Sequence, residues 1–284
     1  MRRISTPAEA RALADLAAAA LTLDLPEAPE LPVRLATPPP DRRWAAFVLG
    51  ENDGVVFTSV DDRDPRIGHI DLIAVHPRAQ GRGYGKALVR AAEEWLRGEG
   101  VRRARWAGNP PCYAWPGIDV RATPAACLAE RLGYEHDGMA WNMTADLTRG
   151  LPEPPEPPPG VTVASAEPGE RAELAAFVRE HWNAAWAWEV ENAVGAYYAA
   201  RDGEILGFAA WGARPGWFGP TGTAPSARGL GIGRVLLHRC LAEQRAAGMT
   251  SVQIGWVGPL RFYSRAVGAR VERVFWQYAR DLDA

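Results

Sequence analysis

Residues 74–88 read AVHPRAQGRGYGKAL, and residues 222–236 read GTAPSARGLGIGRVL. Each stretch closes a short β-type segment with a proline, continues through three glycines separated by single residues, and runs into an apolar helical segment. The N-terminus of a helix presents backbone N–H groups without partners, and glycines let an anion approach those groups closely. The chain therefore carries two copies of a turn that is typical of phosphate-binding sites.

Two other glycine-rich phosphate loops have a different spacing. A dinucleotide-binding loop requires G-x-G-x-x-G, whereas Gly81, Gly83 and Gly85 are spaced by two throughout. A Walker loop requires G-x-x-x-x-G-K-[ST], but Gln80 stands at its first glycine position and Ala87 at its final Ser/Thr position. Both alternatives are excluded by spacing.

The same order of predicted elements surrounds both copies of the turn. Runs of alternating polarity predict strands, and apolar spacings of three and four predict helices. The first half has a helix at 9–21, a hairpin of strands at 43–50 and 54–60, a strand at 69–77, a helix at 85–100 and a strand at 101–108. The second half has a strand at 161–167, a helix at 168–186, a hairpin at 194–212, a helix ending near residue 247, a strand at 251–258, a short helix at 259–268 and a closing strand at 269–282. This repetition predicts an α+β fold in two copies, each with a mixed, mostly antiparallel central sheet flanked by helices.

A proline-rich segment separates the two halves. LPEPPEPPPG occupies residues 151–160, and prolines fill most of the positions from 152 to 159. Proline continues neither a helix nor a sheet ladder and favours an extended, semi-rigid conformation. We therefore expect a first domain at 1–150, a linker at 151–160 and a second domain at 161–284.

Composition excludes several classes of function. The formal net charge is −2 and no long basic run occurs, so we expect no nucleic-acid partner. The cysteines, Cys112, Cys127 and Cys240, form no CxxC pair, and the five histidines are scattered, so we expect no metal site. No apolar run is long enough to span a bilayer and no signal peptide is evident, so we expect a cytoplasmic protein without a membrane partner.

The two stretches resemble the GNAT superfamily of acetyl-CoA-dependent N-acetyltransferases. The pyrophosphate motif of that family is [Gln/Arg]-x-x-Gly-x-[Gly/Ala], preceded by a strand that ends in Val-x-Pro. Both copies fit it, although Thr223 replaces the valine in the second. The resemblance covers nearly the whole chain outside the linker and residues 25–41. It implies tandem GNAT domains that use acetyl-CoA as co-substrate.

The resemblance also implies which residues hold the coenzyme. Backbone N–H groups of the two turns would bind its diphosphate, nearby cations would assist, and strand edges around Val75 and Thr223 would bind pantetheine. Asn109 matches a family position that helps hold the coenzyme, whereas the second half has Gly258 there. The expected turn residues are Gln80, Gly81, Arg82, Gly83, Tyr84, Gly85 and Lys86 in the first half, and Arg228, Gly229, Leu230, Gly231, Ile232, Gly233 and Arg234 in the second.

The expected catalytic groups differ between the halves. Family members protonate the departing thiolate with a tyrosine in a short helix, where a Phe-Tyr pair precedes a glycine. RFYSRAVGA places Tyr263 at that position, but ACLAERLGY leaves Ala129 at the equivalent position of the first half. Tyr263 is therefore the expected general acid.

The expected base lies in the other half. By two-residue alternation His69, Asp71, Ile73 and Val75 share one face of a strand, and the family often carries a basic glutamate there. His69 and Asp71 are accordingly candidate bases of the first half. The equivalent strand of the second half has no carboxylate, which leaves water, His181, Glu189 or Glu191 as its base.

Two functions are compatible with these residues. The first is an N-acetyltransferase acting on a primary amine, mainly through its second half. The second is a catalytically silent acyl-CoA-binding protein. For the enzyme, the acceptor remains open among an aminoglycoside, an amino-sugar thiol precursor, a polyamine and a peptide N-terminus. Trp182 and Trp186 lie one helical turn apart in a segment that often borders the acceptor pocket of the family.

Overall fold

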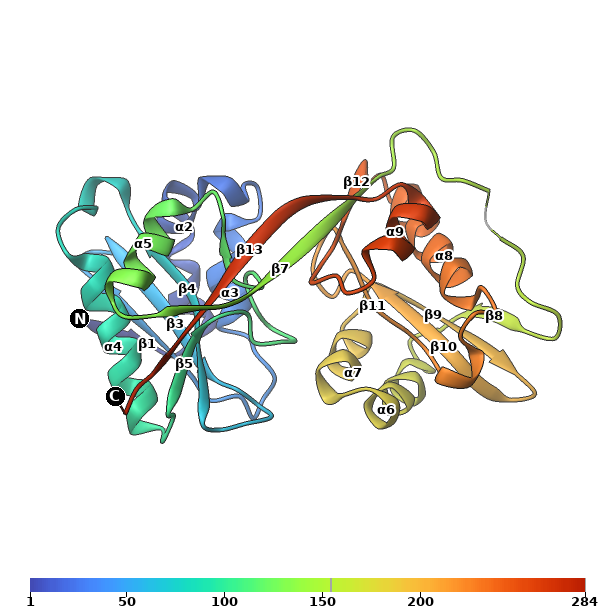
Figure 1. The fold of residues 1–284 in the computed structure, drawn as a ribbon, viewed down its shortest axis with the longest axis horizontal. Helices are drawn as coiled ribbons and strands as arrows, with labels where there is room; N and C mark the ends of the chain where they lie inside the picture. Colours follow the sequence, from blue (N-terminus) through green and yellow to red (C-terminus); the bar gives the residue numbers. More distant parts are fainter. Residues whose placement is uncertain (154, 284) are drawn as a thin grey trace. The chain divides into compact units, whose positions relative to one another are not determined.

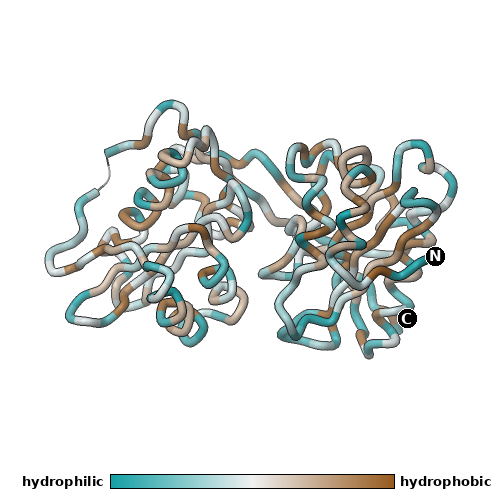
Figure 2. Tube along the Cα trace, turned by 180° about the vertical axis from the view of Figure 1, so that it is seen from behind, coloured by the Kyte–Doolittle hydropathy of each residue, from teal (hydrophilic) through white to brown (hydrophobic). Residues whose placement is uncertain are grey.

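The computed structural model describes residues 1–153 and 155–283 of the chain and divides it into two compact units. Unit 1 comprises Met1–Ala140 and Val274–Ala284, and unit 2 comprises Trp141–Arg273 (Figure 1). In each unit the hydrophobic residues are concentrated in the strands and the helices, whereas most loops are hydrophilic (Figure 2). The predicted class, a mixed sheet flanked by helices in two copies, is confirmed.

Unit 1 is a sheet in the order β1-β2-β3-β4-β5-β13. Its antiparallel strands are followed by the parallel pair β4/β5, after which β13 runs antiparallel to β5. Successive residues of β3 and β4 point to opposite faces of the sheet, and both faces carry apolar side chains. One face therefore packs against the N-terminal helices, and the other packs against α4 and α5. The elements are β1 (Arg2–Ile4), α1 (Pro7–Arg11), α2 (Ala14–Ala20), α3 (Leu31–Leu35), β2 (Trp44–Leu49), β3 (Gly54–Val60), β4 (Ile67–Val75), α4 (Tyr84–Gly98), β5 (Arg103–Trp106), β6 (Ile118–Asp119), α5 (Thr123–Arg131) and the end of β13 (Arg270–Asp281).

Unit 2 repeats this plan in the order β7-β12-β11-β10-β9-β8. The helices α6 and α7 cover one face of its sheet, and α8 and α9 cover the other. The elements are β7 (Glu135–Asp146), β8 (Thr162–Ser165), α6 (Arg171–His181), α7 (Ala184–Glu191), β9 (Gly195–Arg201), β10 (Glu204–Trp211), β11 (Trp217–Thr223), α8 (Ile232–Ala246), β12 (Ser251–Ile254) and α9 (Leu260–Val267).

Each unit takes one strand segment from the other half of the sequence. The second part of β7 pairs with β12 of unit 2 through Met143–Asp146, and the second part of β13 pairs with β5 of unit 1 through Tyr278–Asp281. The segment 151–160 consequently lies within unit 2 and, where it is described, forms neither helix nor strand. The two units therefore differ from the division expected from the prolines, because β7 and β13 each belong to both of them.

Candidate acetyl-transfer site

The two glycine turns have the same backbone conformation. Gly81 and Gly83 have φ values of 74° and 82°, and Gly229 and Gly231 have values of 81° and 85°. Gly83 begins α4 and Gly231 begins α8, in both cases without a side-chain cap. Left-handed φ values favour glycine, and no atom lies within 4 Å of the place where a Cβ would stand at these four residues. Each turn thus exposes uncapped N–H groups of a fifteen-residue helix to an open approach.

The third glycine of each turn serves helix packing. A Cβ at Gly85 would come 2.9 Å from Leu128 of α5, and a Cβ at Gly233 would come 3.6 Å from the ring of Phe262 on α9. The side chain of Gln80 donates to the carbonyl of Val75 at 3.1 Å and so ties the first turn to the end of β4. These residues support the turn from behind rather than facing an anion.

Cations surround both turns. Arg82, Lys86, Arg228 and Arg234 are all exposed, and within the described residues none of them is recorded in an ion pair. Of the remaining turn residues, Leu230 is exposed, Tyr84 is half-buried and Ile232 is buried in the core. Free cations beside uncapped helix N-termini suit a diphosphate.

Beside each turn the parallel strand pair separates. β4 pairs with β5 only from Ile67 to His69, and β11 pairs with β12 only at Trp217 and Phe218. Beyond these residues the described chain provides no strand partner on that side of β4 and β11, although the carbonyl of Val75 accepts from the side chain of Gln80. An extended ligand can hydrogen-bond to such an edge as an added strand does.

Tyr263 lies where β11 and β12 separate. Its ring contacts Phe218 edge-to-face at 6.2 Å between centroids, and Phe218 is the last β11 residue paired with β12. The neighbouring Phe262 ring lies 4.9 Å from the tyrosine ring, also in an edge-to-face arrangement. Burial raises the pKa of Tyr263 to about 12, so the phenol keeps its proton at neutral pH and is available as a donor.

Unit 1 has no such group at the equivalent place. Leu128 on α5 and Phe262 on α9 both contact the third glycine of their turn, so the residues that follow them, Ala129 and Tyr263, occupy equivalent positions. Ala129 is fully buried and carries no proton to donate. The sequence predicts an alanine in one short helix where the other has a tyrosine, and the packing of α5 and α9 places these two residues at equivalent positions.

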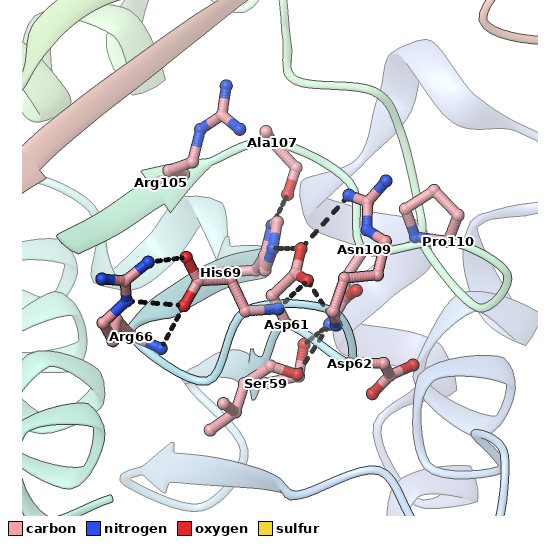
Figure 3. Close-up of polar contacts among 12 residues, drawn as sticks. Ser59, Asp61, Asp62, Arg66, His69, Arg105, Ala107, Asn109 and Pro110 are labelled. Carbon is pink, nitrogen blue, oxygen red and sulfur yellow. Dashed lines mark hydrogen bonds and ion pairs between the residues drawn. The ribbon is translucent and has the colours of Figure 1, made fainter. Parts of the chain in front are cut away.

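His69 is a buried member of a hydrogen-bond network (Figure 3). It is 2% exposed, its Nδ1 lies 2.9 Å from the carbonyl oxygen of Ala107, and its Nε2 lies 3.2 Å from Asp61 Oδ2. Burial alone would raise the pKa of Asp61, but hydrogen bonds from His69 and Arg63 lower it well below the ordinary value. Because both ring nitrogens are already engaged with groups of the fold, neither of them is free to contact a substrate.

Asp71 occupies a β-bulge and not a regular position. Opposite β3, the register steps from Thr58–Ile70 to Phe57–Leu72. Because directly opposed residues point to the same face, this step places His69 and Leu72 on one face and Ile70 and Ile73 on the other. The expectation that His69, Asp71, Ile73 and Val75 share a face is therefore wrong.

The carboxyl group of Asp71 points into a confined space. Its Oδ1 is buried without a hydrogen-bond partner, and burial raises the pKa of this carboxyl to about 6. The cavity beside it measures about 10 Å³ and is lined by Arg42, Ser59, Cys112 and neighbouring residues. Such a volume holds one water molecule and no acceptor.

Asn109 is also committed to internal bonds. It is 2% exposed, and its amide nitrogen donates to Ser59 Oγ at 2.9 Å and to the Val60 carbonyl at 3.1 Å. Its own carbonyl accepts from the buried guanidinium of Arg42, which pairs with Asp62. The amide of Asn109 therefore holds the loop after β5 onto the end of β3 (Figure 3).

Sequence reasoning missed two partners that give these residues their setting. Asp61 binds His69 from the loop after β3, and Phe218 holds Tyr263 at the separation of the strands. The acidic run from Asp61 to Asp64 was a readable signal for the first, whereas Phe218 looks like any core residue of a strand. Within the described residues, no group of three or more His, Cys, Asp or Glu side chains is placed to hold a metal ion, and no helix is long and apolar enough to cross a bilayer.

A mixed sheet with a separated parallel pair, an uncapped glycine turn beside it and a protonated tyrosine at the separation define the acyltransferase class that uses coenzyme A thioesters. The sequence model described as the Acetyltransferase (GNAT) family matches residues 11–114 and 163–268. The chain belongs to this family and is an N-acetyltransferase with two GNAT domains in tandem.

Curated relatives agree with this assignment, and solved structures share the fold. Mycothiol acetyltransferase of Thermomonospora curvata is 31% identical over 232 residues, which cover 73% of this chain and 72% of the relative. The mycothiol acetyltransferase of Thermobispora bispora is also 31% identical, over 88% of this chain and 87% of its own length. A tandem GNAT protein from the clavulanic acid biosynthesis pathway has the same fold, with a TM-score of 0.75, 17% identity and coverage of 99% and 98%. A GCN5-related N-acetyltransferase from Sphaerobacter thermophilus gives a TM-score of 0.71 at 24% identity, with coverage of 99% and 96%.

Proposed function

We propose that this chain transfers the acetyl group of acetyl-CoA to a primary amine of a small acceptor, and that transfer takes place in unit 2. The observation that carries the proposal is Tyr263, a buried phenol with a raised pKa that lies at the separation of β11 and β12. Unit 1 has Ala129 at the equivalent position, so it offers a second coenzyme site without an acid.

In this mechanism the turn at 229–234 binds the coenzyme diphosphate. The N–H groups at the start of α8 and the cations Arg228 and Arg234 face the phosphates, while pantetheine extends along β11 toward Thr223. The turn at 81–86, with Lys86 and Arg82, binds coenzyme in the same way in unit 1. Because Asn109 already donates to Ser59 and Val60, its contribution to coenzyme binding is to shape the loop.

Chemistry then follows from the thioester position. The neutral amine attacks the thioester carbonyl, a backbone N–H of the β11 edge stabilises the oxyanion, and the carbon–sulfur bond breaks. Tyr263 donates its proton to the departing thiolate, and the proton released from nitrogen on amide formation restores the phenol. His69 and Asp71 take no part in this scheme.

The relatives, and the aromatic side chains at the junction of α6 and α7, indicate the class of acceptor. The relatives are named mycothiol acetyltransferases, which favours a low-molecular-weight acceptor of that type over a peptide N-terminus. Trp182 stacks on Trp186, contacts Phe208 of β10 edge-to-face and packs on Gly222 of β11. Trp182 and Trp186 then form one wall of the acceptor pocket.

An acceptor screen tests this proposal. Purified protein is incubated with acetyl-CoA and, separately, glucosamine, a cysteinyl amino sugar, kanamycin, spermidine and a short peptide, and acetylated products are identified by mass spectrometry. We expect acetylation of a small amine, with the cysteinyl amino sugar preferred. Acetyl-CoA binding without any product would instead identify a silent acyl-CoA-binding protein.

A further inference from the structure

The joint between α6 and α7 carries a histidine whose geometry suits proton transfer. α6 ends at His181, Trp182 turns the chain, and Asn183 caps α7 by accepting from the backbone N–H of Trp186 at 2.8 Å. The cap and the stacked indoles fix the direction in which His181 leaves α6. His181 itself is exposed to solvent.

Trp182 places this joint directly over β11. A Cβ at Gly222 would come within 2.6 Å of the Trp182 ring, so the indole packs onto the bare backbone of that glycine. Gly222 lies between Thr221 and Thr223, in the strand segment that we assign to pantetheine. The His181 ring lies 6.1 Å from the Trp182 ring, centroid to centroid. Trp182 therefore connects His181 to the backbone of β11 in the segment that we assign to pantetheine.

The contacts of His181 define which nitrogen is free. Its Nδ1 lies 3.0 Å from the carbonyl oxygen of Phe177, one helical turn earlier. A carbonyl can only accept, so Nδ1 carries a proton and the lone pair of the neutral ring is on Nε2. The ring also lies against Phe177 at 4.4 Å between centroids, which holds its orientation. In contrast to His69, which is buried, this histidine is exposed to solvent.

The other candidate bases of unit 2 are already engaged. Glu191 forms an ion pair with Arg179 at 3.1 Å, and Glu189 has interaction partners of its own. β11 carries no charged residue, and the charged residues next to His181 along α6 are Arg179 and Glu180. Arg179 is paired with Glu191, and α7 also carries Glu189.

We propose that His181 is the general base of the acetyl transfer in unit 2, a role that rests on the function proposed above. Nε2 takes one proton from the acceptor ammonium group, directly or through one water molecule, and releases it to solvent after the reaction. The resulting neutral amine forms the carbon–nitrogen bond as the carbon–sulfur bond breaks, and Tyr263 protonates the sulfur. The second nitrogen proton returns to Tyr263, so one proton is released in each turnover.

His181→Asn tests this role because the asparagine amide can still donate to the Phe177 carbonyl while the Nε2 lone pair is removed. The matched control is His136→Asn, since His136 is likewise exposed and lies against an aromatic ring, that of Tyr278. The measurement is kcat/KM against pH with the best acceptor from the screen. A positioned base typically contributes about 10²-fold or more to the rate. We expect a fall of about that size at neutral pH, recovery as pH rises, and rescue by added imidazole.

Three outcomes distinguish the role of His181 from the proposed acetyl transfer in unit 2. A His181→Asn variant with the wild-type pH profile would overturn the role of His181 alone, provided that Tyr263→Phe remains impaired. Absence of transfer by the unaltered protein would overturn both proposals. Nitrogen-15 NMR of the histidine side chains provides a readout that needs no acceptor: we expect His181 in the Nδ1–H tautomer, and the Nε2–H tautomer would contradict the proposal.

Discussion

Unit 1 and unit 2 share the geometry that binds an anion and differ in the residues where a thioester would react. The φ values of their turn glycines agree within a few degrees, and both turns begin helices of equal length. At the short helix, however, one unit has a buried alanine and the other a buried tyrosine. Coenzyme binding depends on backbone shape, which duplication preserves, whereas transfer depends on a few side chains.

The polar residues of unit 1 are consistent with this difference. His69 and Asn109 form hydrogen bonds within the fold, and the space beside Asp71 is about 10 Å³. In unit 2 the groups proposed to act on the substrate are Tyr263 and, at the junction of α6 and α7, Trp182 and the exposed His181.

The largest expected effect comes from dividing the chain at the proline-rich segment. A fragment of residues 1–150 lacks the part of β13 that pairs with β5, and it lacks the core residues Tyr278 and Leu282. A fragment of residues 161–284 lacks the part of β7 that pairs with β12. We expect neither fragment alone to unfold cooperatively in urea, while the two fragments together restore a cooperative transition. Independent cooperative folding of either fragment would contradict the strand exchange.

The second largest effect is expected from a matched pair of substitutions that tests which glycine turn is needed for transfer. Gly83→Val and Gly231→Val introduce the same strain, because both glycines have left-handed φ values, and both side chains would occupy space that the diphosphate requires. We expect Gly231→Val to remove transfer and Gly83→Val to retain most of it. Calorimetric titration with acetyl-CoA should show one site lost in each variant. Equal loss of transfer in both would refute the assignment of chemistry to unit 2.

Asp61→Asn should weaken unit 1 without disabling the enzyme. The pair His69–Asp61 is almost fully buried, with side-chain exposures of 2% and 4%. Removing the acceptor of a buried hydrogen bond costs about 1–3 kcal/mol, because the donor on His69 is left unsatisfied. We expect urea unfolding to report a loss of this order and the folded variant to keep its transfer rate. Unchanged stability would mean that the contact between Asp61 and His69 does not stabilise unit 1.

Asp71 should produce a smaller, pH-dependent effect. Its pKa is raised by burial from an ordinary 3.8 to about 6, so between these values the folded protein binds more protons than the unfolded chain. The free energy of unfolding therefore decreases as pH rises from about 4 to about 6 and the contribution is constant on either side. Asp71→Asn should abolish this dependence with little change in transfer. A variant with the same pH slope as the unaltered protein would show that the carboxyl is not confined.

The sequence was sufficient for the features that depend on backbone conformation. Glycines spaced by two between a strand and a helix have few physical interpretations, so the turns, the duplication and the mixed sheet could be predicted. The exchange of β7 and β13 could not, because pairing partners of a strand are set by tertiary packing and not by its own alternation. The bulge at Asp71 was hidden for the same reason: one inserted residue changes the face of every residue before it, and no local signal marks the insertion.

The most direct test of the account is Tyr263→Phe in the full chain, measured beside Asp71→Asn. The phenylalanine keeps the ring packing against Phe218 and Phe262 and removes only the phenolic proton. We expect kcat to fall by about 10²-fold or more, with the affinity for acetyl-CoA nearly unchanged, while Asp71→Asn keeps most of the activity. An active Tyr263→Phe protein together with an inactive Asp71→Asn protein would contradict the account and move the reaction to unit 1.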